Sequence, residues 1–169
     1  MFDGMGGNVN MLVKEIMTKK VITLRLDDTL KEVVLKLAEN NISGAPVVDD
    51  DDGVIGILTE TDIMRTLERR GKEVKMVYLS PALQMVGLSF KETPTNKDAE
   101  EIFKEIGNIK VSEMMIRNVK TVGPDDQVKA VIEIVSSGKI NRVPVVKNGK
   151  LVGIVTRGDI IKSMSKIVK

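Results

Sequence analysis

The stretch GIVTRGDI, from Gly153 to Ile160, joins strand-forming residues to the start of a helix and places a threonine three residues before an aspartate. The stretch GILTETDI, from Gly56 to Ile63, repeats this pattern 97 residues earlier. Val, Ile and Leu before the threonine favour a strand, and T-x-x-D resembles the capping box that begins a helix. The pattern therefore predicts that a strand turns directly into a helix near Thr59 and near Thr156.

Both stretches belong to a longer internal repeat. Residues 13–48 align without a gap with residues 111–146, and 13 of the 36 aligned positions are identical. Such self-similarity indicates a duplicated unit whose copies bury their apolar faces against each other. We place the first repeat at residues 11–69 and the second at 110–169. Residues 70–109 are expected to form a helical connecting segment between them, and residues 1–10 are expected to form a flexible head.

Each repeat predicts the order strand, helix, strand, strand, helix. Residues 21–24 and 119–122 are expected to be short strands. Apolar residues at 30, 33, 34 and 37, and again at 128, 131, 132 and 135, have helical spacing. The acidic pairs at 27–28 and 125–126 are expected to cap these helices.

A hairpin is expected in the second half of each repeat. The strands APVV and VIGILT, and then VPVV and LVGIVT, are separated by turns at Asp52-Gly53 and Asn148-Gly149. The expected fold class is an α/β sandwich of the α+β type, with two βαββα repeats packed face to face about a pseudo-twofold axis. In the connecting segment, residues 96–106 are expected to form a helix with an apolar stripe.

Composition limits the chemistry. The chain has 169 residues, 42% apolar and 30% charged, with a net charge of +2, which is typical of one compact domain or two small subdomains. The absence of Cys and His excludes a disulfide, a thiol nucleophile, a histidine base and a Cys/His zinc site. We therefore expect no catalytic residues and no metal site, and we interpret the acidic run at 49–52 as a solvated turn.

Targeting signals are not found in this sequence. The sequence contains no run of eighteen apolar residues, which a membrane-spanning helix would need. Residues 1–10 lack the basic start and the apolar stretch of a secretory signal. We therefore expect a cytoplasmic protein that does not contact a membrane.

Several segments together resemble a known family. They are IMTKKVITL at 16–24, SGAPVVD at 43–49, NRVPVVK at 141–147 and the repeated G-I-[LV]-T-x-x-D-I. Their order is similar to that of a tandem pair of CBS domains, the module named after cystathionine β-synthase and also present in the γ subunit of AMP-activated kinase. The resemblance implies that clefts between the repeats bind adenosine-containing ligands such as AMP, ADP, ATP or S-adenosylmethionine. It implies regulation of an attached or partner protein, without catalysis and without an obligatory cofactor.

The T-x-x-D pattern has two interpretations. A carboxylate can accept hydrogen bonds from the vicinal hydroxyls of a ribose, and a helix N-terminus presents N–H groups to phosphate. Asp62 and Asp159 are then ribose ligands, with Thr59 and Thr156 on the phosphate side. Alternatively, each aspartate only caps its helix. A capping aspartate points back to its threonine, whereas a ribose-binding aspartate faces the cleft.

The resemblance implies that each site is assembled across the pseudo-twofold axis. Strand backbone groups read the adenine edge, and aliphatic side chains cover its face. The first pocket combines Thr59 and Asp62 with Asn118, Val119, Lys120, Thr121, Asn141, Arg142 and Val143. The second pocket combines Thr156 and Asp159 with Lys20, Val21, Ile22, Thr23, Ser43, Gly44 and Ala45.

Three basic residues are candidates for a phosphate contact or, alternatively, are solvated surface residues; they are Lys20, Arg142 and Arg157. A guanidinium makes paired hydrogen bonds to phosphate oxygens. Arg142 aligns with Gly44, and Arg157 aligns with Glu60, so the two pockets are expected to differ. Arg142 is expected beside the pocket that Thr59 closes.

The resulting expectation is a free-standing regulatory protein that binds a small nucleotide ligand and acts on an unknown protein partner. A homodimer is expected, with its interface on the helices at 30–37 and 128–135. The first alternative is a scaffold protein with empty clefts. The second is a nucleic-acid-binding protein, which the scattered basic residues and the few aromatic residues support only weakly.

Overall fold

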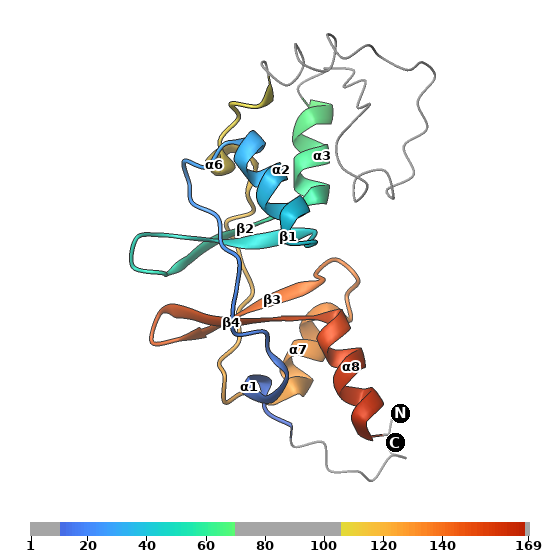
Figure 1. Ribbon diagram of the computed structural model, residues 1–169. Coiled ribbons are helices and arrows are strands. Elements are labelled where there is room, and N and C mark those ends of the chain that lie inside the picture. Colours follow the sequence, from blue (N-terminus) through green and yellow to red (C-terminus); the bar gives the residue numbers. More distant parts are fainter. Residues whose placement is uncertain (1–10, 70–105, 168–169) are drawn as a thin grey trace, which may run out of the picture. The chain divides into compact units, whose positions relative to one another are not determined.

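The computed structural model describes residues 11–69 and 106–167, which divide into two compact units. Of these residues, unit 1 holds 11–21 and 120–167, and unit 2 holds 22–69 and 106–119. Each unit contains one antiparallel hairpin together with helices (Figure 1). The expected α+β class is confirmed. The packing of the two units against each other stays a prediction.

Unit 2 is built on the hairpin of β1 (Gly44–Val48) and β2 (Val54–Thr59). Helices α2 (Leu30–Glu39) and α3 (Glu60–Arg69) lie on one face of this hairpin (Figure 1), and the short helix α6 (Val111–Met114) belongs to the same unit. All five residues of β1 are buried. The aliphatic core therefore fills the space between the hairpin and its helices.

Unit 1 repeats this arrangement. Its hairpin consists of β3 (Arg142–Lys147) and β4 (Lys150–Thr156), and helices α7 (Val128–Val135) and α8 (Arg157–Ile167) lie on one face of it (Figure 1). The short helix α1 (Val13–Ile16) completes the unit. The core consists largely of valines, which are fully buried at positions 13, 131, 143, 145 and 155.

Both predicted hairpins and their turns are confirmed. Asn148 and Gly149 have φ angles of 53° and 80°, as expected for the two residues of a tight turn that needs positive φ. In the other hairpin Asp52 takes the positive φ of 63°. The carboxylate of Asp49 accepts hydrogen bonds from the backbone N–H groups of Asp51 and Gly53, at 3.0 and 2.8 Å. The acidic run is therefore a turn that closes on its own side chain.

The two helices predicted from apolar spacing are confirmed, with one exception on their buried faces. In α2 the buried positions are 30, 33 and 37, and in α7 they are 128, 131 and 135. Val34 packs partly against the core of unit 2, whereas its counterpart Ile132 is 41% exposed. The helix predicted at 96–106 and the head at 1–10 lie outside the described residues, apart from Ile106, which is buried.

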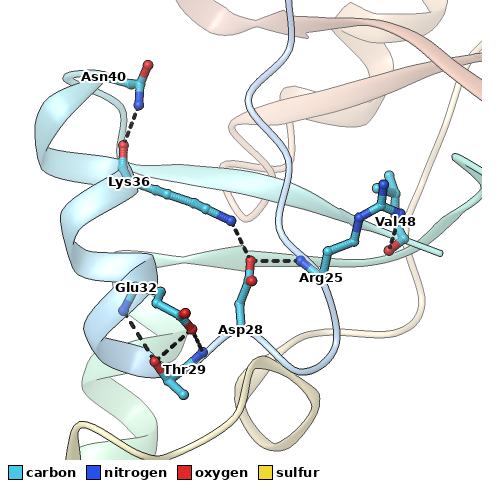
Figure 2. A network of polar contacts seen from close by, with 7 residues as sticks. All are labelled: Arg25, Asp28, Thr29, Glu32, Lys36, Asn40 and Val48. Atoms are coloured by element: carbon cyan, nitrogen blue, oxygen red, sulfur yellow. Dashed lines mark hydrogen bonds and ion pairs between the residues drawn. The ribbon is translucent and has the colours of Figure 1, made fainter. Parts of the chain in front are cut away.

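The predicted capping role of the acidic pairs is wrong. Helix α2 is capped by Thr29, whose hydroxyl accepts from the backbone N–H of Glu32, while the Glu32 carboxylate accepts from the backbone N–H of Thr29 at 2.7 Å (Figure 2). The bonds that the Glu32 carboxylate accepts from the backbone N–H and the hydroxyl of Thr29 hold the pKa of Glu32 below its usual value. In α7 the N-cap residue Gln127 makes no side-chain capping bond.

The second acid of each pair closes the turn that precedes the helix. Asp28 accepts a hydrogen bond from the backbone N–H of Arg25 at 2.9 Å and from the Lys36 ammonium at 2.7 Å (Figure 2). Asp126 accepts one from the backbone N–H of Gly123 at 2.6 Å. Because these N–H groups lie three residues before the carboxylates, local turn closure captures the side chains before they can reach a helix end.

The strands predicted at 21–24 and 119–122 are reduced to single bridges. Only Leu24 pairs with Val47, and only Val122 pairs with Val145, each in parallel orientation. The turns closed by Asp28 and Asp126 begin at the next residue, so the chain leaves the hairpin before a second pair can form. The prediction of short strands was therefore wrong in extent.

The single bridges at Leu24 and Val122 lie on one edge of each hairpin. The other edge pairs with the first segment of the repeat to which the hairpin does not belong. In unit 2, Ile57 and Ile116 exchange two backbone hydrogen bonds of 2.9 Å. In unit 1, Thr18 and Ile154 exchange bonds of 2.9 and 3.0 Å. The compact units therefore differ from the repeats in the sequence, because the first segments of the two repeats are exchanged.

Further contacts hold each exchanged segment in place. The backbone N–H of Val13 donates to the carbonyl of Asp126 at 2.9 Å, and the equivalent Val111 donates to Asp28 at 2.8 Å. Val13 and Val111 are completely buried. Burying one such valine side chain stabilises a fold by roughly 1.5 to 3 kcal/mol, as an upper estimate. The exchange is thus fixed by backbone bonds and by the core.

The first acid of each pair also receives a lysine from the exchanged segment. Lys14 lies 2.7 Å from Asp125, and Lys110 lies 2.8 Å from Asp27. The hydrogen bond that Lys14 donates to Asp125 raises the pKa of Lys14 and lowers the pKa of Asp125, and the bond that Lys110 donates to Asp27 likewise raises the pKa of Lys110. Both pairs are exposed, so they orient the segments more than they stabilise them.

A methionine in each exchanged segment lies over a glycine of the hairpin. A Cβ atom built on Gly153 would lie 2.5 Å from the sulfur of Met17, and one built on Gly56 would lie 2.4 Å from the sulfur of Met115. Both distances are too short for a real Cβ atom. The glycine of the G-I-[LV]-T pattern is therefore needed so that the exchanged segment can approach.

We expect Gly153→Ala to lower the free energy of unfolding by about 1 to 3 kcal/mol, because the added methyl group overpacks the contact with Met17 and with the carbonyl of Thr18. The matched control is Gly158→Ala in α8, where the nearest atom would lie 3.5 Å away and alanine favours the helix. Thermal unfolding of both variants measures the difference. Equal melting temperatures would contradict the role of this glycine.

Candidate functional site

The candidate sites lie at the corners where the hairpins become helices. Strand β2 ends at Thr59 and α3 begins at Glu60, whereas β4 ends at Thr156 and α8 begins at Arg157. No connecting residue separates strand from helix, as the sequence predicts. Each corner thus lies at the N-terminus of a helix.

The aspartates of both corners have capping geometry. Oδ2 of Asp62 accepts from the backbone N–H of Thr59 at 3.0 Å and from its hydroxyl at 2.5 Å. Oδ2 of Asp159 accepts the same pair of bonds from Thr156, at 2.8 and 2.6 Å. The backbone N–H of Asp159 donates in return to the Thr156 hydroxyl at 3.3 Å. Each aspartate points back to its threonine, which is the arrangement expected of a cap.

Capping engages only one oxygen of each carboxylate. Oδ1 of Asp62 lies 3.6 Å from the guanidinium of Arg65, an exposed side chain, although Asp62 itself is only 5% exposed. Oδ1 of Asp159 accepts no hydrogen bond from any residue that the structure describes. A carboxylate has about four lone-pair positions. A cap on Oδ2 is therefore compatible with a ligand hydroxyl on Oδ1, and ribose binding stays a prediction.

The segment before each proline lies beside the T-x-x-D corner of its own repeat. Gly44 pairs with Thr59, and the backbone N–H of Glu60 donates to the carbonyl of Ser43 at 3.1 Å. In the other unit, Arg142 pairs with Thr156, and the backbone N–H of Arg157 donates to the carbonyl of Asn141 at 3.2 Å. The following residues, Ala45 and Val143, are buried in the cores.

The predicted site residues are distributed over both units. Exposed members are suited to contact a ligand directly, and half-buried members are suited to line a cleft. Exposed are Lys20, Ser43, Asn118, Lys120, Thr121, Asn141 and Arg157, and half-buried are Val21, Ile22, Thr23, Thr59, Val119, Arg142, Thr156 and Asp159. Because each predicted pocket joins residues of both units, its assembly stays a prediction.

The position of Arg142 bears on its predicted assignment. The sequence places it with Thr59, across the two repeats. Within unit 1, however, strand pairing puts it directly opposite Thr156. The hairpin therefore places the backbone of Arg142 next to the corner of Thr156. A contribution to the pocket of Thr59 stays a prediction.

No group of three acidic residues suited to a metal ion occurs in 11–69 or 106–167. In these same ranges no helix is long and apolar enough to cross a membrane. The acidic run at 49–52, which the sequence analysis interprets as a solvated turn, is exposed.

Sequence reasoning missed two pairs of structural residues near the corners. Met17 and Met115 cover the glycines of the hairpins, and Glu15 and Glu113 cap the short helices α1 and α6. All four are identical between the repeats. The signal was thus present as V-x-E-x-M, but its role depends on contacts with a hairpin far away in the sequence.

We expect Thr156→Val to lower the free energy of unfolding by about 1 kcal/mol, because the variant removes the hydroxyl that bonds to Asp159. Thr156→Ser keeps the hydroxyl and is the matched control. Urea denaturation gives both values. A valine variant as stable as the serine variant would show that the observed cap contributes nothing.

Comparison with known proteins finds one family match in each repeat. A family model of the CBS domain matches residues 13–69 and 111–166. Protein MJ1426 of Methanocaldococcus jannaschii is 34% identical over 161 residues, which cover 93% of this chain and 95% of that protein.

Two solved structures are similar in fold and sequence. The CBS domain of a CBS domain containing membrane protein from Sphaerobacter thermophilus is 30% identical, with a TM-score of 0.66, covering 91% of this chain and 88% of that chain. The CBS domain pair of protein MJ0100, solved in complex with 5′-methylthioadenosine and S-adenosyl-L-methionine, is 27% identical. Its TM-score is 0.66, with 93% of this chain and 98% of that chain covered.

Proposed function

This chain belongs to the CBS domain family, and we propose that it is a regulatory module whose two repeats bind adenosine-containing ligands and report their occupancy to another protein. The repeats are residues 11–69 and 110–169, joined by 70–109. The ligand class includes AMP, ADP, ATP and S-adenosylmethionine. The module is cytoplasmic and performs no catalytic step in this proposal.

The observation that carries the proposal is the strand-to-helix corner found in both repeats, where only one oxygen of the aspartate carboxylate caps the helix. At Thr156 the Oδ2 atom of Asp159 is held by two hydrogen bonds, so the position of Oδ1 is fixed before a ligand arrives. A fixed acceptor loses little freedom when it receives a ribose hydroxyl. The relative MJ0100, which binds two adenosine derivatives, supports the ligand class.

Each corner contributes to binding in a defined way. The Oδ1 atoms of Asp62 and Asp159, which do not take part in the caps, accept ribose hydroxyls, as an acidic residue does in dinucleotide-binding folds. The positive N-terminal ends of α3 and α8 face the 5′ substituent. Backbone groups at 21–23 and 119–121 read the adenine edge, with Val21 and Val119 against its face. Binding then changes the angle between the repeats or the geometry of a dimer.

We expect an adenosine ligand at about a hundred times its Kd to raise the free energy of unfolding by roughly 2.7 kcal/mol. Asp62→Asn and Asp159→Asn keep an oxygen for the cap but lose the second acceptor and the charge. Each is expected to weaken binding at one site by about tenfold or more, since a hydrogen bond to a charged group contributes about 1.5 to 3 kcal/mol. Asp50→Asn, in the exposed turn, is the control.

Isothermal titration with AMP, ATP, S-adenosylmethionine and methylthioadenosine measures these effects. A double aspartate variant that binds like the parent would overturn the site assignment. A parent that shows neither heat nor a melting shift with any of the four ligands would favour the scaffold alternative. A steeply salt-dependent affinity for RNA or DNA would favour the nucleic-acid alternative.

The proposal includes a homodimer whose interface lies on α2 and α7. Leu35 is 51% exposed and Ile132 is 41% exposed, and both are large apolar side chains on these helices. Exposed apolar side chains on a helix often mark an interaction surface. The partner that reads the occupancy of the module is a separate protein.

We expect light scattering to give the mass of a dimer for the parent and of a monomer for the double variant Leu35→Lys and Ile132→Lys. Lysine keeps the helix propensity and places two charges in the interface. Lys31→Ala and Lys129→Ala, exposed on the same helices, form the control. A monomeric parent at high concentration would contradict the dimer.

A further inference from the structure

Helix α8 exposes an apolar face that its counterpart α3 buries to a much greater extent. Ile161 is 66% exposed and Met164 is 53% exposed, and residues three apart lie on the same side of a helix. The aligned residues of α3 are Met64, which packs partly against the core of unit 2, and Leu67, which is only 4% exposed. The two repeats therefore differ in what covers this face of the helix.

In unit 2, the residues directly before α6 complete the core around α3. Ile106 and Ile109 are almost completely buried. They belong to the same apolar cluster as Leu67, and Met64 packs against that cluster. Helix α6 itself contacts α3. The chain that enters α6 thus contributes apolar side chains to the core that buries the face of α3.

Unit 1 begins the same arrangement. The backbone N–H of Leu30 donates to the carbonyl of Ile109 at 2.7 Å. The aligned bond in unit 1, from Val128 to Met11, measures 2.9 Å. Met11 packs against the core that contains Ile160, and α1 contacts α8. The chain therefore enters both units at equivalent places, each next to the final helix of the repeat.

The residues before Met11 can continue along the same path. In unit 2, the backbone N–H of Lys31 donates to the carbonyl of Gly107 at 3.1 Å, and the aligned pair in unit 1 is Lys129 and Val9. Ten extended residues span up to about 33 Å. Positions 160 to 164 of α8 span only about 6 Å along the helix axis. The head at 1–10 is therefore long enough to reach and follow the exposed face.

We propose that the head, residues 1–10, packs along α8 and covers the apolar face of Ile161 and Met164. The head has one charged residue, Asp3, and its apolar side chains are Met1, Phe2, Met5 and Val9. A second copy of the chain is the weaker candidate, because the aligned face in unit 2 is buried by residues of the same chain. The inference replaces the expectation of a flexible head, and it does not depend on adenosine binding.

Cross-linking tests the contact, since the chain contains no cysteine. Met164→Cys is combined in turn with Phe2→Cys, Met5→Cys or Val9→Cys under mild oxidation. We expect at least one of these pairs to form a disulfide within one chain, because docking brings the two Cβ atoms close together. The matched control replaces Met164→Cys by Lys162→Cys, which is exposed on another side of α8. Non-reducing electrophoresis and peptide mapping identify the bonds.

A stability cycle tests whether the contact matters for folding. Deletion of residues 1–10 is expected to raise the equilibrium constant of unfolding by about tenfold, because the apolar face returns to water. In the double variant Ile161→Gln and Met164→Gln, the same deletion is expected to change the constant by less than about threefold. Glutamine keeps the helix propensity. Lys162→Gln is the control, in which the deletion keeps its full effect, and urea denaturation measures all constants.

Several results would overturn the inference. Equal cross-linking at positions 162 and 164 would show a head that does not prefer this face, as would no disulfide with any of the three head positions. A disulfide between two chains that carry only Met164→Cys would assign the face to a second copy. A deletion with the same effect in the parent and in the glutamine variant would show that the head acts elsewhere. Adenosine binding is measured separately, so the proposed function can hold or fail independently.

Discussion

The structure depends on backbone pairing at the second edge of each hairpin. A two-stranded hairpin is marginal by itself, and here its outer strand is completed by a residue from the start of the other repeat, Ile116 in unit 2 and Thr18 in unit 1. The glycine before the isoleucine in G-I-[LV]-T gives room for the methionine that precedes this residue. Each unit is therefore complete only when both ends of the duplicated sequence are folded. This is a physical reason why the repeat occurs as a pair.

The same strand that receives the exchanged segment ends at the candidate site. From Gly153 and Ile154, which contact the exchanged segment, only one residue intervenes before Thr156 and its bond to Asp159. The capping carboxylate thus lies close in the chain to the pairing with the exchanged segment. This geometry is compatible with the proposed function, in which one oxygen caps the helix and the other binds a ligand hydroxyl.

Much of the fold could be predicted from local patterns. The hairpins follow from Asn148-Gly149 and from alternating valines, and the helices follow from the 3.6-residue spacing in α2 and α7. Local patterns failed where a side chain has competing partners. Asp28 and Asp126 close turns because a backbone N–H group three residues earlier is nearer than the helix end. The single bridges at Leu24 and Val122 result from the same turns.

The sequence singles out candidate residues, and both their role and their grouping into pockets stay predictions. The repeat singled out Asp62 and Asp159, and the aligned positions showed that Arg142 replaces Gly44. Strand register, which depends on tertiary pairing, then placed Arg142 opposite Thr156. The exchange of the first segments could not be predicted from the sequence either, because V-x-E-x-M has the same local pattern whichever hairpin it pairs with.

A crystal structure of the chain with AMP tests the central claim most directly. We predict that the ribose hydroxyls lie within about 3.2 Å of Oδ1 of Asp159, while Oδ2 keeps its bonds to Thr156. A well-ordered AMP bound away from both aspartates, or bound only after the cap at Thr156 has broken, would contradict the claim that one oxygen caps the helix while the other binds the ribose.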